Sequence, residues 1–516
     1  MEQAQQAVLL EMPEQPAAER PADPANVSPK LKPVDREQTM LAQIYIEELI
    51  GPDHKARAIW ELVGRLDLSA FAVALKTREG GVGRAAWNPR LLVSIWVYAY
   101  SEGIGSAREI ERVMQWEPGL QWLSALEKIN HHSLSDFRMQ QRKALDDVFT
   151  QILGMLQNTG LLSLERVMHD GTKIRAQAGS DTFRREKTLR EHLEEAQKVV
   201  EAMGDPQAEG ERDRSTAARE RAARERKQVL EQAMEEMKTL QEGLSEEERK
   251  TVRVSETEPE ARRMKHGDNA IVPSYNAQIT TSADHKIVVN AELTQCSSDA
   301  QSLMPALEQV TTRMQEQPGQ AVVDGGFTNR ATIQACAEKK IDLVGSLPAP
   351  EERSASAMKA AGIDPAFAPH QFRILTETKQ LQCPAGCLLD YWRDSRKRDD
   401  VYQQYRARGE DCRVCEQRRK CCPRNAESGR VVSIRVAEQA DVAAFRQRMK
   451  EPEMKEIYKQ RGAVAEFPHA WIKEKLGLRK FHVRGMVKAG CELLWVCLTY
   501  NIQQYLRLSK TPAATA

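Results

Sequence analysis

The sequence lacks a long apolar run, a secretion signal and an excess of either charge. No stretch of about 18 uninterrupted apolar residues occurs, so we expect no membrane span. The first residues are acidic early and contain no basic segment ahead of a long apolar one, which argues against a secretion signal. We therefore expect a cytoplasmic protein with no membrane partner.

The near absence of net charge would argue against DNA binding if the charges were evenly spread. The total is +1, from 75 Lys+Arg against 74 Asp+Glu. However, Arg393–Arg424 holds 11 basic and 6 acidic residues, a net charge of +5, and Lys473–Lys510 holds 8 and 2, a net charge of +6. Because phosphate binding needs local positive patches, the composition permits a DNA partner without requiring one.

The length allows two or three domains at about 150 residues each, and the apolar share of 41% suffices for a packed core. Residues 1–35 are rich in Pro, Ala, Glu and Gln without an apolar period, which predicts a disordered lead-in. We expect the rest to divide into a helical domain at 36–160, an α/β domain at 161–508 and a tail at 509–516.

The first of these domains shows a helical pattern throughout. Asn88-Pro-Arg opens one helix, Ser106 is expected to cap a second, and Ser133 is expected to cap another that runs to about residue 156. Short helices joined by tight turns, with Arg138 and Arg142 on the last, suit a helix-turn-helix-like DNA-binding module. An ordinary helical bundle would give the same periodicity.

After residue 160 the pattern changes to alternating strands and helices. The expected order is a strand ending at Asp170, two β-rich runs, a helix, an apolar strand ending at Asp324, a further strand and a late helical region at 437–508. That order fits an RNase H-like α/β core. Two insertions are expected in it, a charged helical hairpin at 180–260 and a Cys-rich segment at 380–425.

Three acids are candidates for metal binding. Phosphoryl transfer on DNA is commonly catalysed by two divalent ions about 4 Å apart, held by carboxylates from separate elements. Asp170 and Asp324 each end an apolar strand before glycine, although Asp-Gly is also a common turn. Glu466 precedes Lys473 by seven residues, so the two share a face if the segment is helical, but these residues alone favour an ordinary amphipathic helix with scattered charge.

Beyond these patterns, the chain from about Pro33 resembles the DDE transposases of bacterial insertion sequences, in the subgroup with a Tyr-Arg-Glu-Lys C-terminal signature. The matching motifs are Asp53–Arg57, Asn88–Arg90, Ser133–Arg138, His169–Lys173, Pro273–Gln278 with Thr294, Ser298–Gln301, Val323–Phe327, the signature Tyr458, Arg461, Glu466 and Lys473, and its continuation Phe481, Arg484-Gly485 and Lys488. The order Phe467-Pro-His and the alanine at 470 depart from the usual pattern near Glu466.

The resemblance implies an RNase H-like domain that cleaves DNA at terminal inverted repeats and joins the freed 3′-hydroxyl to target DNA. It implies that Asp170, Asp324 and Glu466 bind Mg²⁺ or Mn²⁺. Double-stranded DNA is the implied partner, and a homodimer is expected because two element ends must be handled together. The residues expected to contact or position DNA are Tyr458, Arg461, Lys473, Arg484, Lys488, Arg138 and Arg142.

Six of the ten cysteines fall within 40 residues, which in a cytosolic chain favours metal over disulfides. Cys412-x-x-Cys415 has the spacing with which two thiolates bind one tetrahedral ion. Related transposases carry a similar pattern, so a structural zinc site is expected on Cys383, Cys412, Cys415 and Cys421. Reduced thiols without metal are the alternative. The other cysteines are Cys387 and Cys422, which are substitute ligands, and Cys296, Cys336, Cys491 and Cys497, which are expected in the core.

Two other functions remain open at this stage. A catalytically silent protein could keep the fold and bind element ends, for example as a repressor. A stand-alone nuclease could cut without strand transfer, but the helical N-terminal region favours end recognition. An active transposase would be cytoplasmic and associated with the nucleoid when bound to DNA.

Overall fold

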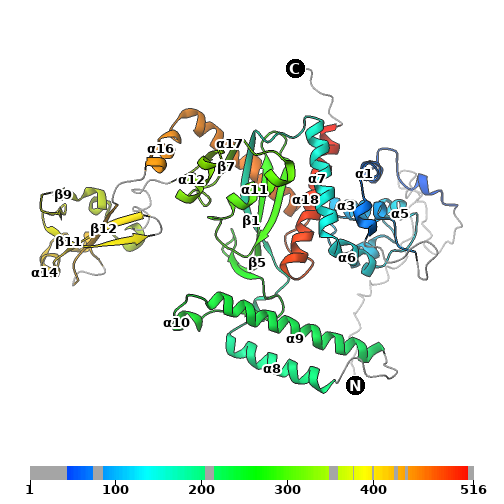
Figure 1. Ribbon diagram of the computed structural model, residues 1–516, viewed down its shortest axis with the longest axis horizontal. Helices are drawn as coiled ribbons and strands as arrows, with labels where there is room; N and C mark the ends of the chain where they lie inside the picture. The colour runs from blue at the N-terminus through cyan, green and yellow to red at the C-terminus, as the bar shows by residue number, and fades with distance from the viewer. Residues whose placement is uncertain are drawn as a thin grey trace, which may run out of the picture. The chain divides into compact units, whose positions relative to one another are not determined.

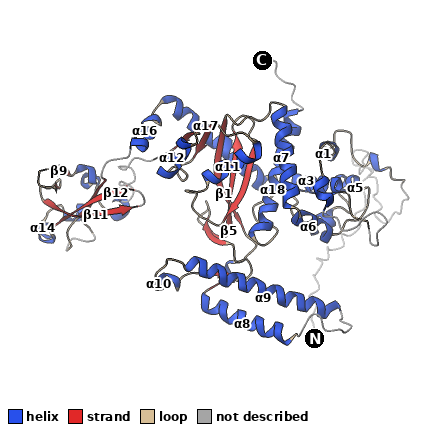
Figure 2. Cartoon of the chain, viewed as in Figure 1, coloured by secondary structure: helices blue, strands red, loops and turns tan. Residues whose placement is uncertain are grey.

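The computed structural model describes residues 43–73, 85–203, 214–347, 358–375, 377–397, 400–423, 428–435 and 440–509. The lead-in expected at 1–35 and the tail beyond Ser509 lie outside these residues. The chain divides into two compact units, 1–45 and 46–516, and all elements below belong to the second. In Figure 2 most strand residues gather around β1 and β5 or around β11 and β12, and the remaining elements are mainly helical.

The N-terminal part of this unit is helical, as expected. As expected, Asn88-Pro-Arg opens a helix: α3 begins at Pro89, and the side chain of its N-cap Asn88 accepts a hydrogen bond from the amide of Arg90. Asn130 does the same for α6, so the helix begins before Ser133, and a separate α7 follows. Ser106 precedes α4 without a side-chain cap bond. The elements are η2 Ile46–Glu48, α1 Lys55–Val63, α2 Ser69–Val73, α3 Pro89–Ser101, α4 Ala107–Val113, α5 Pro118–Ser124, α6 His131–Gln140 and α7 Arg142–Asn158.

A six-stranded sheet follows, with the order β4-β5-β1-β7-β8 and with β6 also paired to β5. The strands are β1 Arg166–Arg175, β4 Arg262–Lys265, β5 Ile271–Ser282, β6 Val288–Thr294, β7 Gln320–Val323 and β8 Asp342–Gly345. β1 is parallel to β7 and antiparallel to β5. The strand expected to stop at Asp170 continues to Arg175, because the long β5 pairs with it along that whole length.

Both faces of this sheet are covered, which explains the apolar strands. Alternate side chains of a strand point to opposite faces. Val167 belongs to the main core, to which α11 (Leu303–Met314) and α18 (Met486–Ser509) contribute. The next residue, Met168, packs in a separate cluster with Ile457 and Val464 of α17 (Pro452–Glu474). The first part of α17 therefore packs on the Met168 side of β1, whereas Ile472 near the end of the helix joins the main core. Figure 1 shows α17 beside this sheet. α12 (Arg330–Glu338) and α16 (Ala440–Arg448) contact each other beside β8.

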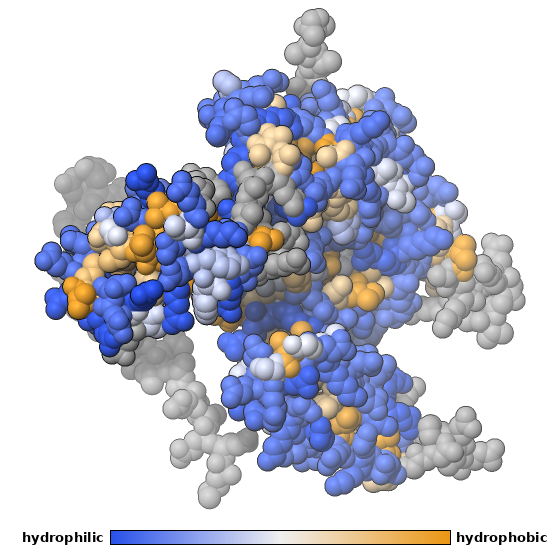
Figure 3. Space-filling model, turned by 60° about the vertical axis from the view of Figure 1, so that its left-hand side comes forward, coloured by the Kyte–Doolittle hydropathy of each residue, from blue (hydrophilic) through white to orange (hydrophobic). Residues whose placement is uncertain are grey.

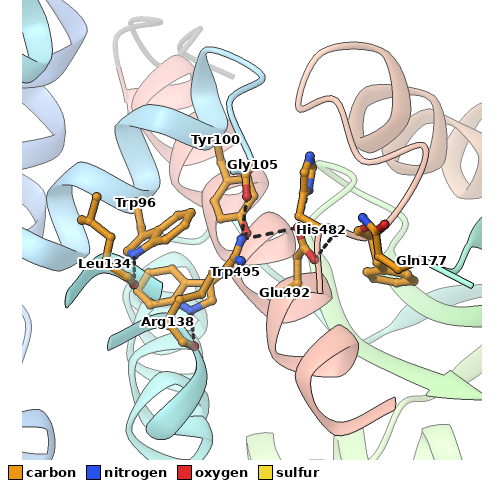
Figure 4. A network of polar contacts seen from close by, with 10 residues as sticks. Trp96, Tyr100, Gly105, Leu134, Arg138, Gln177, His482, Glu492 and Trp495 are labelled. Atoms are coloured by element: carbon orange, nitrogen blue, oxygen red, sulfur yellow. Dashed lines mark hydrogen bonds and ion pairs between the residues drawn. The ribbon is translucent and has the colours of Figure 1, made fainter. Parts of the chain in front are cut away.

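The main core runs without interruption from the N-terminal helices into α18. Arg138 of α6 lies at this junction and is only 3% exposed. Its guanidinium donates to the Gly105 carbonyl and the Tyr100 hydroxyl and lies 3.6 Å from the buried Glu492 of α18, which also accepts from His482 (Figure 4). The prediction that Arg138 contacts DNA is therefore wrong: its charge is neutralised inside the protein.

Between β1 and β5 the chain forms a pair of charged helices. They are α8 Glu186–Ala202 and α9 Arg214–Gln241, followed by α10 Glu246–Arg249, with η3 Ser180–Thr182, β2 Phe183–Arg184 and β3 Val254–Ser255 at the base. A small apolar cluster holds the pair together, and it comprises Leu189, Ala196, Leu230, Ala233, Met237 and Val254. Most other side chains of the pair are exposed, in keeping with the largely hydrophilic surface in Figure 3.

The cysteine segment contains a second sheet, which its charged, Cys-rich sequence does not predict. It is antiparallel, with the order β13-β12-β11-β10-β9. Its elements are η4 Pro365–Phe367, η5 Pro369–Gln371, β9 Arg373–Leu375, β10 Gln380–Gln382, β11 Leu388–Lys397, β12 Asp400–Ala407, α14 Gly409–Val414, α15 Arg418–Cys421 and β13 Val431–Arg435. We call residues 365–435, as far as they are described, the cysteine module. No helix in the described part of the chain is long and apolar enough to cross a membrane.

Candidate active site and cysteine cluster

Two of the predicted acids lie next to each other at the end of β7. His169 of β1 pairs with Val323 of β7 in parallel register, so Asp170 and Asp324 follow paired residues. Burial raises the pKa of Asp170 to about 6, the nearby Arg461 opposes this shift, and the negative charge of Asp324 adds to it. A buried carboxyl that repels a second one favours binding of a cation at this point.

The loop after β7 holds Asp324 in place. Its Oδ1 accepts a hydrogen bond of 2.6 Å from the amide of Gly326, and its carbonyl accepts one from the Thr328 hydroxyl. A Cβ on Gly326 would lie 3.0 Å from this same Oδ1, so glycine allows the tight turn. The turn fixes one carboxylate oxygen of Asp324 by a backbone contact.

A third carboxylate, Asp299, lies close to the first two and was not identified from the sequence. Its Oδ1 accepts hydrogen bonds of 2.8 Å from the side-chain amides of Asn276 and Gln278 on β5. A Cβ on Gly171 would lie only 2.7 Å from this oxygen, so the glycine after Asp170 makes room for Asp299. Asn276 and Gln278 are two residues apart on a buried strand, so their side chains lie on the same face. Two buried amides on one face were the sequence pattern that could have indicated a polar partner such as Asp299.

A buried histidine, His169, orients the Gln278 amide. Burial lowers the pKa of His169 to about 4, so the ring is neutral. Its Nε2 lies 3.0 Å from Oε1 of Gln278 and its Nδ1 lies 2.9 Å from Oγ1 of Thr280. The amide oxygen of Gln278 can only accept, so Nε2 carries the proton. The Gln278 amino group is then directed to Asp299.

Helix α17 places two cations against β1. Arg461 Nη1 lies 3.3 Å from Asp170 Oδ2, and Lys473 Nζ lies 2.6 Å from Thr172 Oγ1. Arg461 and Asp170 are both largely buried, with side-chain exposures of 19% and 16%. Asp170 and Thr172 point to the same face of β1, so α17 follows the strand along the candidate site.

The structure does not bring Glu466 into the same group. Glu466 is exposed on α17, five residues after Arg461 and seven before Lys473, and its Oε1 lies 3.6 Å from the position of a Cβ on Gly462. In the described part of the chain, no three His, Cys, Asp or Glu side chains come close enough to hold one metal ion. Asp170 and Asp324 are therefore adjacent, whereas Glu466 lies on the neighbouring helix outside their group.

The other predicted DNA-contacting residues differ in exposure. Tyr458 packs against the cluster under α17, and Arg142 is half-buried, with its guanidinium at the α18 backbone of Gly490. Arg484 and Lys488 are exposed at the start of α18. Only the last two present an open cationic surface.

The six clustered cysteines line one small cavity of about 30 Å³ in the cysteine module. They are Cys383, Cys387, Cys412, Cys415, Cys421 and Cys422. The sulfur of Cys383 accepts a hydrogen bond from the Cys387 amide at 3.2 Å, and that of Cys412 accepts one from Arg430 at 3.4 Å. Burial and the neighbouring thiols raise the pKa of Cys387 to about 11, and burial has the same effect on Cys421.

The remaining four cysteines follow the prediction with one exception. Cys336, Cys491 and Cys497 are buried, as expected of core cysteines. Cys296 is exposed in the loop after β6, so its assignment to the core was wrong. Strand β6 ends at Thr294, and Cys296 follows in a polar loop at the surface.

Two comparisons with protein families bear on this arrangement. Residues 44–140 match a family described as transposase domain (DUF772), and residues 382–506 match one described as transposase DDE domain. These matches support a DDE transposase. The second match covers the cysteine module from residue 382, all of α17 and most of α18, and so includes Glu466.

Other comparisons add little. A search of curated proteins gave no match. Among solved structures, a chain of the piggyBac transposase synaptic complex with hairpin DNA is similar at 9% identity, covering 89% of this chain and 83% of that chain. Its TM-score is 0.29, too low to establish a common fold.

Proposed function

We propose that the chain is a transposase of a bacterial insertion sequence, in the subgroup with the Tyr-Arg-Glu-Lys signature and with an RNase H-like core. It cleaves DNA at the terminal inverted repeats and joins the 3′-hydroxyl ends to target DNA. The observation that carries this proposal is the adjacency of Asp170 and Asp324 on parallel strands, beneath a helix that supplies Arg461 and Lys473.

The donor set fits a hard divalent cation. Mg²⁺ and Mn²⁺ prefer carboxylate oxygens, and Asp170 and Asp324 offer these at a place where burial and mutual repulsion already favour a positive charge. We propose Asp170, Asp324 and Glu466 as the ligands. The bound ions would polarise the phosphate and activate water, and then the 3′-hydroxyl, as nucleophile.

The surrounding residues have distinct tasks in this proposal. Arg461 neutralises Asp170 in the absence of metal and transfers to a DNA phosphate when the site fills. Lys473 steers the strand along β1 from its position at Thr172. Asp299 and the amides that hold it position the backbone around Gly171.

Glu466 must move toward the two aspartates for the set to be complete. It is exposed, so its side chain is free to rotate without disturbing the core. Pro468 lies inside α17 only two residues later, and a proline within a helix removes one backbone hydrogen bond. We propose that DNA, by drawing Arg461 and Lys473 toward phosphate, brings this part of α17 to the site.

For the cysteine module we propose a structural zinc ion on Cys383, Cys412, Cys415 and Cys421. Six thiols line one small cavity, and backbone amides donate to the sulfurs of Cys383 and Cys412; the thiols must draw closer to hold the ion, since no three described side chains lie near enough as they stand. Four cysteines leave no open coordination position, so the ion braces the module. The remaining partners proposed are double-stranded DNA and a second copy of the chain, in the cytoplasm and at the nucleoid.

One observation favours a second candidate, a silent DNA-binding protein derived from a transposase. Glu466 lies outside the group formed by Asp170 and Asp324. A chain whose third acid never reaches the other two would bind element ends without cutting them.

Cleavage of labelled element ends in Mg²⁺ separates the two candidates. DNA flanking the gene supplies the ends, and Asp324→Asn is compared with Asp284→Asn, the same change in the exposed turn between β5 and β6. We expect wild type and Asp284→Asn to cut at the repeat boundary, and Asp324→Asn to bind the ends without cutting. Binding by the wild type without metal-dependent cleavage would support the silent protein instead.

A further inference from the structure

The outer face of the cysteine module carries an aromatic side chain between two arginines. The register of β11 and β12 shifts between Tyr391 and Arg393, which pair with Tyr405 and Gln404 respectively. Trp392 is therefore the extra residue of a β-bulge. Bulges commonly redirect side chains at functional sites.

The bulge brings Trp392 and Arg393 to the same side of the sheet. Tyr405 is buried among the inner apolar residues, and its partner Tyr391 lies on the same side of the strands at their margin, where it is 43% exposed and reaches the groove beside Trp392. Trp392, the next residue, faces outward. Gln404 faces outward, and it accepts a hydrogen bond of 2.9 Å from Arg393 Nε. Without the extra residue, regular alternation would have placed Arg393 on the inner face.

The guanidinium groups lie close to the indole ring. The guanidinium carbon of Arg393 is 4.2 Å from the Trp392 ring centroid, and that of Arg406 is 5.2 Å from it. The Nε of Arg406 is fixed by the Ser428 carbonyl. Trp392 nevertheless remains 44% exposed, beside a shallow groove of about 400 Å³ that Arg408 also lines.

We infer that this platform, defined as Trp392, Arg393 and Arg406, binds unpaired nucleotides of DNA. A large exposed indole offers a stacking surface for any base, and the arginines beside it match the phosphates that follow the base. In duplex DNA the faces of the bases are covered by their neighbours, so only frayed or freed strand ends reach the indole. DNA as the partner rests on the proposed function.

Charge complementarity favours this occupant over an apolar one. The stretch Arg393–Arg424 has a net charge of +5, and the groove has Asp390 as its acidic lining residue, which lies 3.8 Å from Arg408. An apolar protein segment would cover Arg393 and Arg406, whose printed hydrogen bonds go to the neutral Gln404 and Ser428, without supplying an anion. The described features therefore fit an anionic ligand with a flat ring.

The test measures binding of the full chain to a labelled 12-nucleotide single strand and to the matching duplex, by fluorescence anisotropy without metal. We expect Trp392→Ala to weaken single-strand binding about ten-fold or more, within the range for loss of one stacked base. Trp392→Phe should retain most of the affinity, and duplex binding should stay near the wild-type value.

Trp116 provides a matched control. It is 54% exposed and stacks near Arg112, whose guanidinium carbon is 5.2 Å from its ring. We expect Trp116→Ala to bind the single strand like wild type. Arg393→Gln should reduce the dependence of single-strand affinity on salt by about 0.7 in the log–log slope, the value for one phosphate contact.

Two outcomes would overturn the inference: Trp392→Ala binding the single strand as wild type does, or losing single-strand and duplex binding equally. Melting curves of Trp392→Ala and Trp392→Phe exclude a folding defect. The proposed function fails separately. If the chain cuts element ends but binds single strands independently of Trp392, only this inference is contradicted. If single-strand binding depends on Trp392 but element ends are not cut, only the proposed cleavage is contradicted.

Discussion

The sheet and helix α17 present their candidate metal ligands in different ways. On the sheet, register with β7 places Asp170 beside Asp324, and a turn and a glycine fix their surroundings. On α17, Glu466 is exposed, while Arg461 of the same helix forms an ion pair with Asp170. Strand pairing thus brings two of the three proposed metal ligands together in the absence of metal and DNA. The third, on the helix, is not yet in position.

The largest effect is expected from the sheet half. Asp170→Asn should lower cleavage at least about a hundred-fold, as removal of one charge-stabilising group typically does. The asparagine fits the same space, so DNA binding and folding should persist. Timed cleavage of labelled ends, with anisotropy on the same DNA, checks both. Substantial cleavage by this variant would remove Asp170 from the catalytic set.

Glu466→Gln tests whether the acid on α17 contributes to metal binding before DNA is bound. In the absence of DNA it should bind Mn²⁺ like wild type, because Glu466 does not then contribute, whereas Asp324→Asn should lose this binding. With DNA and Mg²⁺ both variants should fail to cut. Calorimetric titration of Mn²⁺ and a cleavage assay give the two readouts. A loss of Mn²⁺ affinity in DNA-free Glu466→Gln would show that the helix acid is already in place.

In the cysteine module the proposed ligands line one cavity, but no three of them lie close enough in the described structure to hold one ion. Cys415→Ser should lower the zinc content of purified protein from about one ion per chain to nearly none, given that four thiolates are the usual structural set. Cys296→Ser, which changes an exposed cysteine outside the module, serves as control and should keep its zinc. Wild-type protein free of zinc after reduced, chelator-free purification would contradict the assignment.

The pKa of Asp170 predicts a pH dependence of metal binding. Its value in the folded protein is raised to about 6 from 3.8, so the carboxyl holds a proton below pH 6. Because a divalent ion competes with that proton, Mn²⁺ affinity should fall about ten-fold per unit below pH 6 and level off above it. In metal-free protein, the stability linked to this group is present below pH 4 and is lost as the pH rises through 6. A flat affinity profile from pH 5 to 8 would contradict this.

The smallest effect is expected at Asp299. Its charge helps to raise the pKa of Asp170, so Asp299→Asn should move the midpoint of the Mn²⁺ profile to lower pH. The amide oxygen still accepts from one of its two partners, so the fold should survive. The same titration across pH checks the shift. An unchanged midpoint would mean that Asp299 acts only as a hydrogen-bond acceptor.

Sequence patterns placed Asp170 and Asp324 on apolar strands before glycine, and the resemblance proposed them as metal ligands, but neither predicted their surroundings. Apolar runs ending in Asp-Gly located Asp170 and Asp324, although β1 continues past Asp170 because its partner strand lies far along the chain. Arg138 was misread because its burial depends on Glu492, more than 350 residues later. The bulge at Trp392 was missed because a charged, Cys-rich stretch hides the alternation of its strands.

The most direct test of the paired acids replaces one ligand oxygen by sulfur. Asp324→Cys should not cut element ends in Mg²⁺, which binds thiolate poorly, and should regain cleavage in Mn²⁺, which accepts it more readily. Asp284→Cys should cut in both metals. If Asp324→Cys binds DNA but stays inactive in both metals, or cuts normally in Mg²⁺, Asp324 does not hold the catalytic ion.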